Sequence, residues 1–163
     1  MSRLRVTGAL AAVSISLSAA AQTFTDTAVM PVALDIVASC TVSAADLHFG
    51  RYIGTSATPS RGQSAIELQC TSGLTVDIGL DAGQGAGATT SDRRLMSGAG
   101  ALRYGLFQDP ARRINWGNTA GVDTVEVSAA GTRQIVTIYG EVPAGQQVPA
   151  GTYNDVITIH LFY

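Results

Sequence analysis

The residues that could support acid–base or metal chemistry are few in this chain and do not converge. His48 and His160 lie far apart, each in a segment that alternates like a β-strand, where half-exposed sheet positions are the simpler interpretation. Asp77 and Asp81 share one side of a strand-like segment and its exit, which favours exposure to solvent over a catalytic carboxylate pair. No serine stands in a G-x-S-x-G motif, and the aspartates match no calcium loop. We therefore expect neither an enzyme nor a metal or other cofactor.

The beginning of the chain has the features of a secretory signal. Two arginines precede an apolar run from Val6 to Leu17, and small residues suited to cleavage follow. A transmembrane anchor is the alternative, but the apolar run is too short to span a bilayer. We expect residues 1–21 to be removed, the mature chain to begin at Gln22, and no insertion into a membrane.

Charge argues against nucleic acid as a partner. The ten basic side chains are all arginine, and the acidic ones number 12. Without Arg3 and Arg5, eight arginines remain against 12 acids, so the mature chain has a net charge of −4. A surface of this sign repels a phosphate backbone, and we expect no nucleic-acid partner.

Cys40 and Cys70 are the two cysteines of the chain. In an exported protein an even pair is most simply one disulfide. Two free thiols in a metal or redox site are the alternative, but the chain has no C-x-x-C motif and no nearby pair of histidines. On the loop-entropy model, closing this loop stabilises the fold by about 3 to 4 kcal/mol.

Hydrophobic periodicity predicts strands and almost no helix. The segment from Phe24 to Ala38 alternates with a period of two, which indicates one long strand or two in series. Seven further segments of this kind, separated by Gly, Pro, Asn and Ser, are 47–53, 65–71, 74–80, 102–108, 123–127, 133–142 and 153–163. Strands at this spacing are typical of an antiparallel, immunoglobulin-like sandwich.

Two segments that could bind a ligand have simpler interpretations. The stretch from Asp81 to Gly100 is rich in glycine, but it lacks the helix and lysine of a phosphate loop, so we expect a long flexible connection. Trp116 could stack on a sugar in a lectin-like module, whereas a single tryptophan in a sandwich usually belongs to the core. Both interpretations of Trp116 remain open from the sequence.

The last segment, VITIHLFY from Val156 to Tyr163, has the pattern of a strand without a closing turn. Such a strand has one row of amides and carbonyls without an obvious partner. The apolar segment from Phe24 to Leu34 also has no local partner. The two could pair within one molecule and give a closed monomer, or the leading segment of one molecule could add to the final strand of another.

Seven motifs follow one another along nearly the whole mature chain. They are CTVSAADLHFG at Cys40–Gly50, LQCTSG at Leu68–Gly73, LDAGQG at Leu80–Gly85, RRLM at Arg93–Met96, LRYGLFQDPARRINWGN at Leu102–Asn118, VTIYGEVPAGQ at Val136–Gln146 and PAGTYNDVITIHLFY at Pro149–Tyr163. As a set they resemble the spore coat protein U domain family, the pilin-like subunits of archaic chaperone–usher fimbriae in Gram-negative bacteria. The set is specific, although no single motif is decisive.

The resemblance implies an all-β fold, an incomplete immunoglobulin-like antiparallel sandwich that lacks its last (G) strand and is completed by a donor strand from another subunit. A periplasmic chaperone would fill the gap first, and an outer-membrane usher would export the growing polymer. Cys40 and Cys70 would join the first strand to a later one. The chain would then comprise a signal peptide (1–21), an N-terminal donor-strand extension (22–34) and a pilin-like sandwich domain (35–163).

Site residues follow from this resemblance together with strand parity. For the donor strand we predict Phe24, Ala28, Met30, Val32 and Leu34. Asp26 shares their parity and Pro31 interrupts the amide ladder, so the handover from the donor to the first strand could lie on either side of Pro31. For the acceptor groove and chaperone-binding strand we predict Ile157, Ile159, Leu161 and Tyr163, which share one face.

The sequence thus favours a structural subunit of a chaperone–usher fimbria that polymerises by donor-strand exchange and supports adhesion and biofilm formation. Its partners would be identical or related pilin subunits, a periplasmic chaperone and an outer-membrane usher. It would be exported through the periplasm to the surface of a Gram-negative bacterium. A secreted, monomeric, lectin-like binding module is the alternative function.

Overall fold

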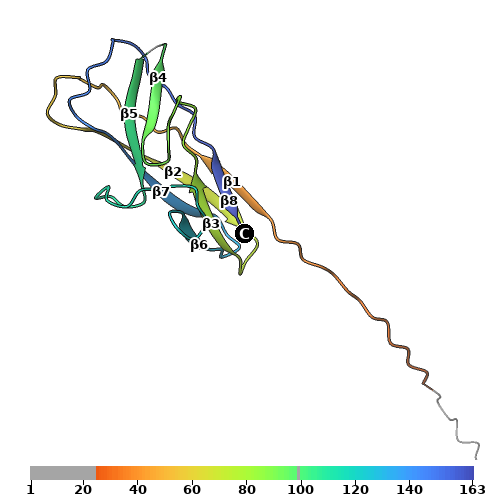
Figure 1. Cartoon of the computed structure of the whole chain (residues 1–163). Coiled ribbons are helices and arrows are strands. Elements are labelled where there is room, and N and C mark those ends of the chain that lie inside the picture. The colour runs from red at the N-terminus through yellow and green to blue at the C-terminus, as the bar shows by residue number, and fades with distance from the viewer. Residues whose placement is uncertain (1–24, 99) are drawn as a thin grey trace, which may run out of the picture. The chain divides into compact units, whose positions relative to one another are not determined.

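The structure, a computed structural model, describes residues 25–98 and 100–163 (Figure 1). The chain divides into two units, Met1–Asp35 and Ile36–Tyr163. Residues 25–39 form no helix or strand, and their side chains are exposed. The strand predicted from Phe24 to Ala38 is therefore wrong for the single chain, with Phe24 itself outside the described residues. An extended segment becomes a strand only when a second backbone pairs with it.

The second unit is built of strands, and every described pair of them is antiparallel. Their bounds are β1 (Cys40–Ala44), β2 (Ser60–Cys70), β3 (Thr75–Leu80), β4 (Arg93–Ser97), β5 (Gly100–Phe107), β6 (Val125–Ser128), β7 (Gln134–Val142) and β8 (Ile159–Phe162). They form a five-stranded sheet in the order β1-β2-β7-β5-β4 and a three-stranded sheet in the order β6-β3-β8 (Figure 1). The all-β antiparallel sandwich predicted from the sequence is confirmed.

The core lies between the two sheets and takes alternate residues from their strands. Its wholly buried members include Ile66 of β2 and Ile78 of β3. Trp116, from the loop after β5, is also wholly buried, and its indole N–H donates to the carbonyl oxygen of Ile78 at 2.7 Å. A buried indole cannot stack on a sugar, so the structure supports the core interpretation of Trp116.

The strand predicted at residues 47–53 is wrong, because these residues form a loop. The alternation of Leu47 and Phe49 has another cause, since both side chains are partly buried and pack against the core from this loop. The loop crosses β2 so closely that a Cβ on Gly62 would lie 2.6 Å from the carbonyl oxygen of His48. A side chain at Gly62 would therefore push the loop away from the sheet.

The flexible connection predicted for Asp81–Gly100 is also wrong in its second half, where β4 pairs with β5. β4 begins with Arg93, whose side chain is wholly buried. Its guanidinium donates to the carbonyl oxygens of Leu80, Asp81 and Trp116 at 2.8 Å each and to that of Thr90 at 2.5 Å. One cation therefore fixes the end of β3, the glycine-rich loop and the tryptophan loop to β4.

Replacing Arg93 by methionine should destabilise the protein strongly, because four carbonyl oxygens lose their donor while little volume changes. We expect a loss of about 3 to 5 kcal/mol in the free energy of unfolding. The measurement is urea denaturation with the disulfide intact. Arg94→Met is the matched control: Arg94 is a partly exposed neighbour that donates to the Ala86 carbonyl, and its loss should cost less than about 1 kcal/mol. Equal costs for the two variants would contradict the role assigned to Arg93.

Candidate functional site

Two edge strands, one from each sheet, border the same opening in the sandwich. Among residues 25–98 and 100–163, β1 pairs with β2 alone and β8 pairs with β3 alone. Ala44 of β1 and Ile159 of β8 line the same hollow. Each edge carries a row of backbone N–H and C=O groups that can still form a ladder.

The hollow between these edges has a volume of about 380 Å³ and mostly apolar walls. Ala44 of β1 lines one side, and Ile157 and Ile159 line the other. Its lining also includes Leu80 and Leu106, which are otherwise buried core residues. Buried core residues therefore form part of the wall of the hollow, and its chemistry is that of a site for apolar side chains.

A second and larger hollow adjoins the first. Its volume is about 1150 Å³, and it lies between the loop of residues 46–54 and the segment of residues 148–155. Leu47, Phe49 and Leu95 line both hollows. Residues of the segment that leads into β8 line both hollows, and we call the two hollows together the open groove.

The segment before β8 is attached to both sheets. Met96 of β4 and Asn154 exchange two backbone hydrogen bonds, of 2.8 and 3.1 Å. Four residues later, the carbonyl oxygen of Thr158 accepts the N–H of Asp81 at 3.1 Å. The final segment thus crosses from the edge of one sheet to the edge of the other, and this crossing places Ile157 beside the open groove.

Asp155 fixes the start of this crossing. One of its carboxylate oxygens accepts the hydroxyl of Tyr104 at 2.7 Å, and the other accepts the N–H groups of Gln84 and Val156 at 2.8 Å each. Burial, together with this hydrogen bond to Asp155, raises the pKa of Tyr104 well above its ordinary value. The phenol therefore stays protonated and remains a donor to Asp155.

Asp81 fixes the other end of the crossing. One of its carboxylate oxygens accepts the N–H groups of Thr158 and Gly83 at 3.0 Å each. Partial burial raises the pKa of Asp81, but these hydrogen bonds outweigh it and hold the pKa below its ordinary value of 3.8. The carboxylate is the form that binds the segment leading into β8.

Acid should weaken this attachment. Because the pKa of Asp81 is lower in the folded protein, its contribution is complete above about pH 4 and is lost as the pH falls through the folded pKa. Asp81→Asn removes the titration, so the variant should be less stable than the natural chain at pH 6 by no more than about 1 kcal/mol, and the difference should shrink towards pH 2.5. Urea denaturation of both proteins at each pH measures the difference in their free energies of unfolding. The other carboxylates titrate in both proteins, so their contributions cancel in this difference. A constant difference across this range would contradict the assignment.

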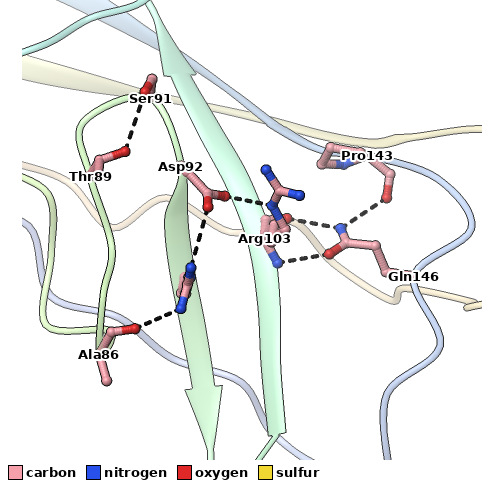
Figure 2. A network of polar contacts seen from close by, with 8 residues as sticks. Ala86, Thr89, Ser91, Asp92, Arg103, Pro143 and Gln146 are labelled. Atoms are coloured by element: carbon pink, nitrogen blue, oxygen red, sulfur yellow. Dashed lines mark hydrogen bonds and ion pairs between the residues drawn. The ribbon is translucent and has the colours of Figure 1, made fainter.

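A network of polar contacts joins the hairpin of β4 and β5 to the loops around it (Figure 2). Asp92 lies between two arginines, accepting from Nε of Arg103 at 2.6 Å and from Arg94 at 3.4 Å. The hydrogen bond from Arg103 is the main cause that lowers the pKa of Asp92. Figure 2 also shows Gln146, whose amide bonds the N–H and C=O of Arg103 at 2.8 and 2.9 Å and the carbonyl of Pro143 at 3.2 Å. These contacts brace the loop after β7 against β5.

The predicted acceptor residues occupy different positions. Ile157, Ile159 and Leu161 are half-buried and pack against the core, and the two isoleucines line the open groove. Tyr163 is 60% exposed and lines neither hollow. The role of all four in accepting a strand stays a prediction.

The predicted donor residues are exposed. Met30, Val32 and Leu34 are 80%, 84% and 88% exposed, and Ala28 is exposed as well. Phe24 lies outside the described residues. Apolar side chains on a segment without a strand partner are available to another surface, and their role as a donor stays a prediction.

The disulfide between Cys40 and Cys70 is present and closes the ladder of β1 and β2 at a pair of directly opposed residues. Thr71 continues this ladder by one residue, since its N–H donates to the carbonyl of Ser39 at 2.9 Å. The disulfide thus anchors the first strand where residues 25–39 lead into the sandwich.

Replacing both cysteines by serine should destabilise the sandwich by about 3 to 4 kcal/mol, because the disulfide closes a loop with a sequence separation of 30. Urea denaturation of the double variant measures this cost against the oxidised natural chain. The natural chain under reducing conditions is the control and should lose a similar amount. A loss below about 1 kcal/mol in both cases would show that the edge strand does not depend on the bond.

Sequence reasoning did not identify Arg93, Tyr104 and Asp155, which hold the frame of the groove. Arg93 and Tyr104 lie in the motifs RRLM and LRYGLFQ, but their hydrogen-bond partners are distant in sequence, so spacing alone carried no signal for them. Of the two histidines, His48 is exposed in a loop and His160 is half-buried in β8. Residues 25–98 and 100–163 contain no cluster of three His, Cys, Asp or Glu side chains that could hold a metal ion.

No helix in these same ranges is long and apolar enough to cross a membrane.

The fold and its open groove define the class of this protein as an immunoglobulin-like sandwich with an incomplete edge. A sequence profile of the Spore Coat Protein U domain matches residues 26–160. The chain is also 31% identical to Protein U of Myxococcus xanthus over 167 aligned positions, which cover 93% of both chains. The chain belongs to the spore coat protein U domain family.

One solved structure agrees with this fold. A chain in the crystal structure of the CsuC–CsuE chaperone–tip adhesion subunit pre-assembly complex, from archaic chaperone–usher Csu pili of Acinetobacter baumannii, superposes with a TM-score of 0.59 at 20% identity. The match covers 78% of this chain, which spans only 40% of the length of that chain. The Hda pilus minor tip subunit HdaB of E. coli gives a TM-score of 0.40 at 19% identity, with 74% of this chain and 79% of that chain covered, and adds nothing to the fold assignment.

Proposed function

We propose that this protein is a structural subunit of a chaperone–usher fimbria that polymerises by donor-strand exchange. The observation that carries the proposal is the open groove, which core residues line beside two unpaired edges, in a chain whose residues 25–34 are exposed. We call residues 22–34 the arm. The arm of one subunit would fill the open groove of the next and so build a fibre.

The groove suits a strand better than a small ligand. Its first hollow lies beside the unpaired backbone edges of β1 and β8 and has mostly apolar walls. A β-strand that enters it gains main-chain hydrogen bonds from the edges and places alternate side chains in the core. One chain of the pre-assembly complex from the archaic Csu system shares the fold, which agrees with this interpretation.

Magnitude supports a lasting joint. Four or five buried side chains at about 1.5 to 3 kcal/mol each contribute on the order of 6 to 15 kcal/mol before ordering costs. This range is similar to the stability of a whole domain. A subunit with an empty groove would therefore be marginally folded and prone to aggregate, which is the reason to expect a periplasmic chaperone until assembly.

The remaining parts of the proposal follow from this mechanism. Residues 1–21 would direct export to the periplasm, an outer-membrane usher would release the polymer, and the domain would comprise residues 35–163. The fibre would stand on the surface of a Gram-negative cell, where it would support adhesion and biofilm formation. The lectin-like alternative has lost its main support, since Trp116 is wholly buried.

Deletion of the arm tests the proposal. The natural mature chain should form fibres and oligomers that survive SDS without heating, because each joint is nearly as stable as a domain. The variant without residues 22–34 should form none, but it should still bind a synthetic peptide of the arm sequence. Unheated gels and electron microscopy measure assembly, and fluorescence anisotropy of the labelled peptide measures binding. A scrambled peptide is the control.

A natural chain that stays monomeric and refolds reversibly without a chaperone would contradict strand exchange. Assembly of the deletion variant as efficiently as the natural chain would do the same. The family name and the 31% identical Protein U favour a second destination, a spore coat built by the same joint. Electron microscopy of cells that express the protein distinguishes a surface fibre from a coat layer.

A further inference from the structure

The outer face of the five-stranded sheet has a charge opposite to that of the rest of the chain. Ile66, Leu102 and Ile138 are buried, so the odd-numbered residues of β2, β5 and β7 point away from the core. Five of the eight arginines of the mature chain belong to this outer face: Arg61, Arg94, Arg103, Arg112 and Arg133. The acids paired with them are Glu67, Asp92 and Glu141.

This distribution directs an acidic partner to the outer face. Five arginines and three acids give the face a net charge of +2. The rest of the mature chain has three arginines and nine acids, and therefore a net charge of −6. A potential of one sign over one face attracts partners of the other sign to that face.

Two arginines of this face keep N–H groups available to a partner. Arg61 donates from Nε to Glu141 at 2.8 Å, and Arg103 donates from Nε to Asp92 at 2.6 Å. The terminal nitrogens lie outside these hydrogen bonds, as Figure 2 shows for Arg103. The two arginine side chains are 59% and 66% exposed. The acids thus hold each guanidinium in place, while its terminal N–H groups can bind a further carboxylate.

Two aromatic side chains lie beside these ion pairs. Gln63, Tyr139 and Phe107 are directly opposed and form one row across β2, β7 and β5. The next row consists of Arg61, Glu141 and Gly105. Phe107 leans into that second row, because a Cβ on Gly105 would lie 2.7 Å from Cζ of its ring. The glycine therefore gives the ring room to lie on the sheet.

Arg112 adds a further cation to this surface. Its guanidinium lies over the Tyr139 ring, 5.9 Å from the centroid, and its Nε donates to the carbonyl of Gly140 at 3.1 Å. Its φ is 56°, and it is the one non-glycine residue with a positive φ in the ranges 25–98 and 100–163. Such a backbone costs free energy and persists where other contacts fix it. The loop after β5 thus holds a strained residue whose side chain is fixed beside the aromatic row.

We propose that this outer face binds an acidic polysaccharide, with sugar rings on Phe107 and Tyr139 and carboxylates on the arginines beside them. The C–H face of a sugar ring is weakly positive and matches the negative face of an aromatic ring. From the spacing and rise of the strands, the Cα atoms of Arg61 and Arg103 are about 12 Å apart, which is comparable to a disaccharide. We call six residues the aromatic face: Arg61, Gln63, Arg103, Phe107, Arg112 and Tyr139.

Other acidic partners fit the aromatic face less well. Duplex DNA carries one charge about every 1.7 Å, and the surrounding acids would repel most of its length. An anionic membrane has no sugar ring to place on Phe107 and Tyr139. In a second copy, acids on the outer face of the smaller sheet are already engaged, since Asp77 accepts the hydroxyl of Thr124 at 2.8 Å.

This inference does not depend on strand exchange. None of the six residues of the aromatic face lines either hollow of the open groove. The buried Trp116 takes no part in it either. A single subunit and a fibre should therefore bind a short oligosaccharide with the same affinity per site.

Three polymers separate the contributions of charge and ring in the full mature chain. Polygalacturonate has rings and carboxylates, its methyl ester has rings alone, and polyacrylate has carboxylates alone. Fluorescence anisotropy of a short labelled oligogalacturonate measures binding, with each polymer as a competitor. We expect polygalacturonate to compete at least about tenfold better than the other two. Equal competition by either of them, or no binding of the labelled oligomer, would overturn the proposal.

Variants locate the site. Arg61→Gln and Arg103→Gln should each weaken binding of the labelled oligomer about tenfold, and Phe107→Leu about fivefold. Arg51→Gln is the matched control, because Arg51 is exposed in the loop of residues 46–54 and its replacement removes the same charge. It should change the affinity by less than about twofold. Thermal unfolding checks that each variant is folded in the assay. Equal losses in Arg51→Gln and Arg61→Gln would show a general effect of charge and contradict a site.

Two further measurements test the other occupants. Duplex DNA and vesicles of phosphatidylglycerol should displace the labelled oligomer poorly. Displacement as efficient as that by polygalacturonate would assign the face to polyanions in general and overturn the choice of a polysaccharide. In light scattering, the natural mature chain and Arg61→Gln should form particles of the same size. Smaller particles of the variant would assign the face to a second copy instead.

Discussion

The constraint on which this structure depends is that a buried backbone group needs a partner. In the part of the chain that the structure describes, the open edges of β1 and β8 leave two rows of N–H and C=O groups without a ladder partner beside a hollow with mostly apolar walls. Core residues such as Leu80 line this hollow. In a monomeric protein an unpaired edge of this kind promotes aggregation. In a protein that assembles, the same edge can pair with a strand of the next subunit.

The polar contacts around the groove hold that edge in place in the single chain. Arg93 ties four carbonyl oxygens of separate loops to β4, while Asp81 and Asp155 hold the two ends of the crossing that leads into β8. These contacts are local replacements for the missing ladder. They keep Ile157 and Ile159 at the groove. On the proposed function, the acceptor segment is therefore already ordered, and only the incoming strand loses conformational freedom on binding.

Strand periodicity predicted β2, β3, β5 and β7 well, because their alternation reflects one buried and one exposed face. It failed at residues 47–53, where Leu47 and Phe49 alternate because a loop packs across the sheet. It failed again at β4, because the surrounding glycines and the pair Arg93 and Arg94 are typical of an exposed loop. Arg93, the first residue of this strand, is in fact buried. A buried arginine looks like a surface residue until its acceptors are known.

The sequence by itself determined the class of fold, the cysteine pair and the alternation of apolar residues in the arm, because composition and period two are local properties. The placement of β1 beside β8, the groove between them and the hydrogen bonds of Arg93, Tyr104 and Asp155 were decided only by the tertiary structure. Many of these contacts join residues far apart in the chain: Arg93 and Asp81 are separated by 12 positions, Tyr104 and Asp155 by 51, and Gln84 and Asp155 by 71. No local pattern can pair groups that only the folded chain brings together.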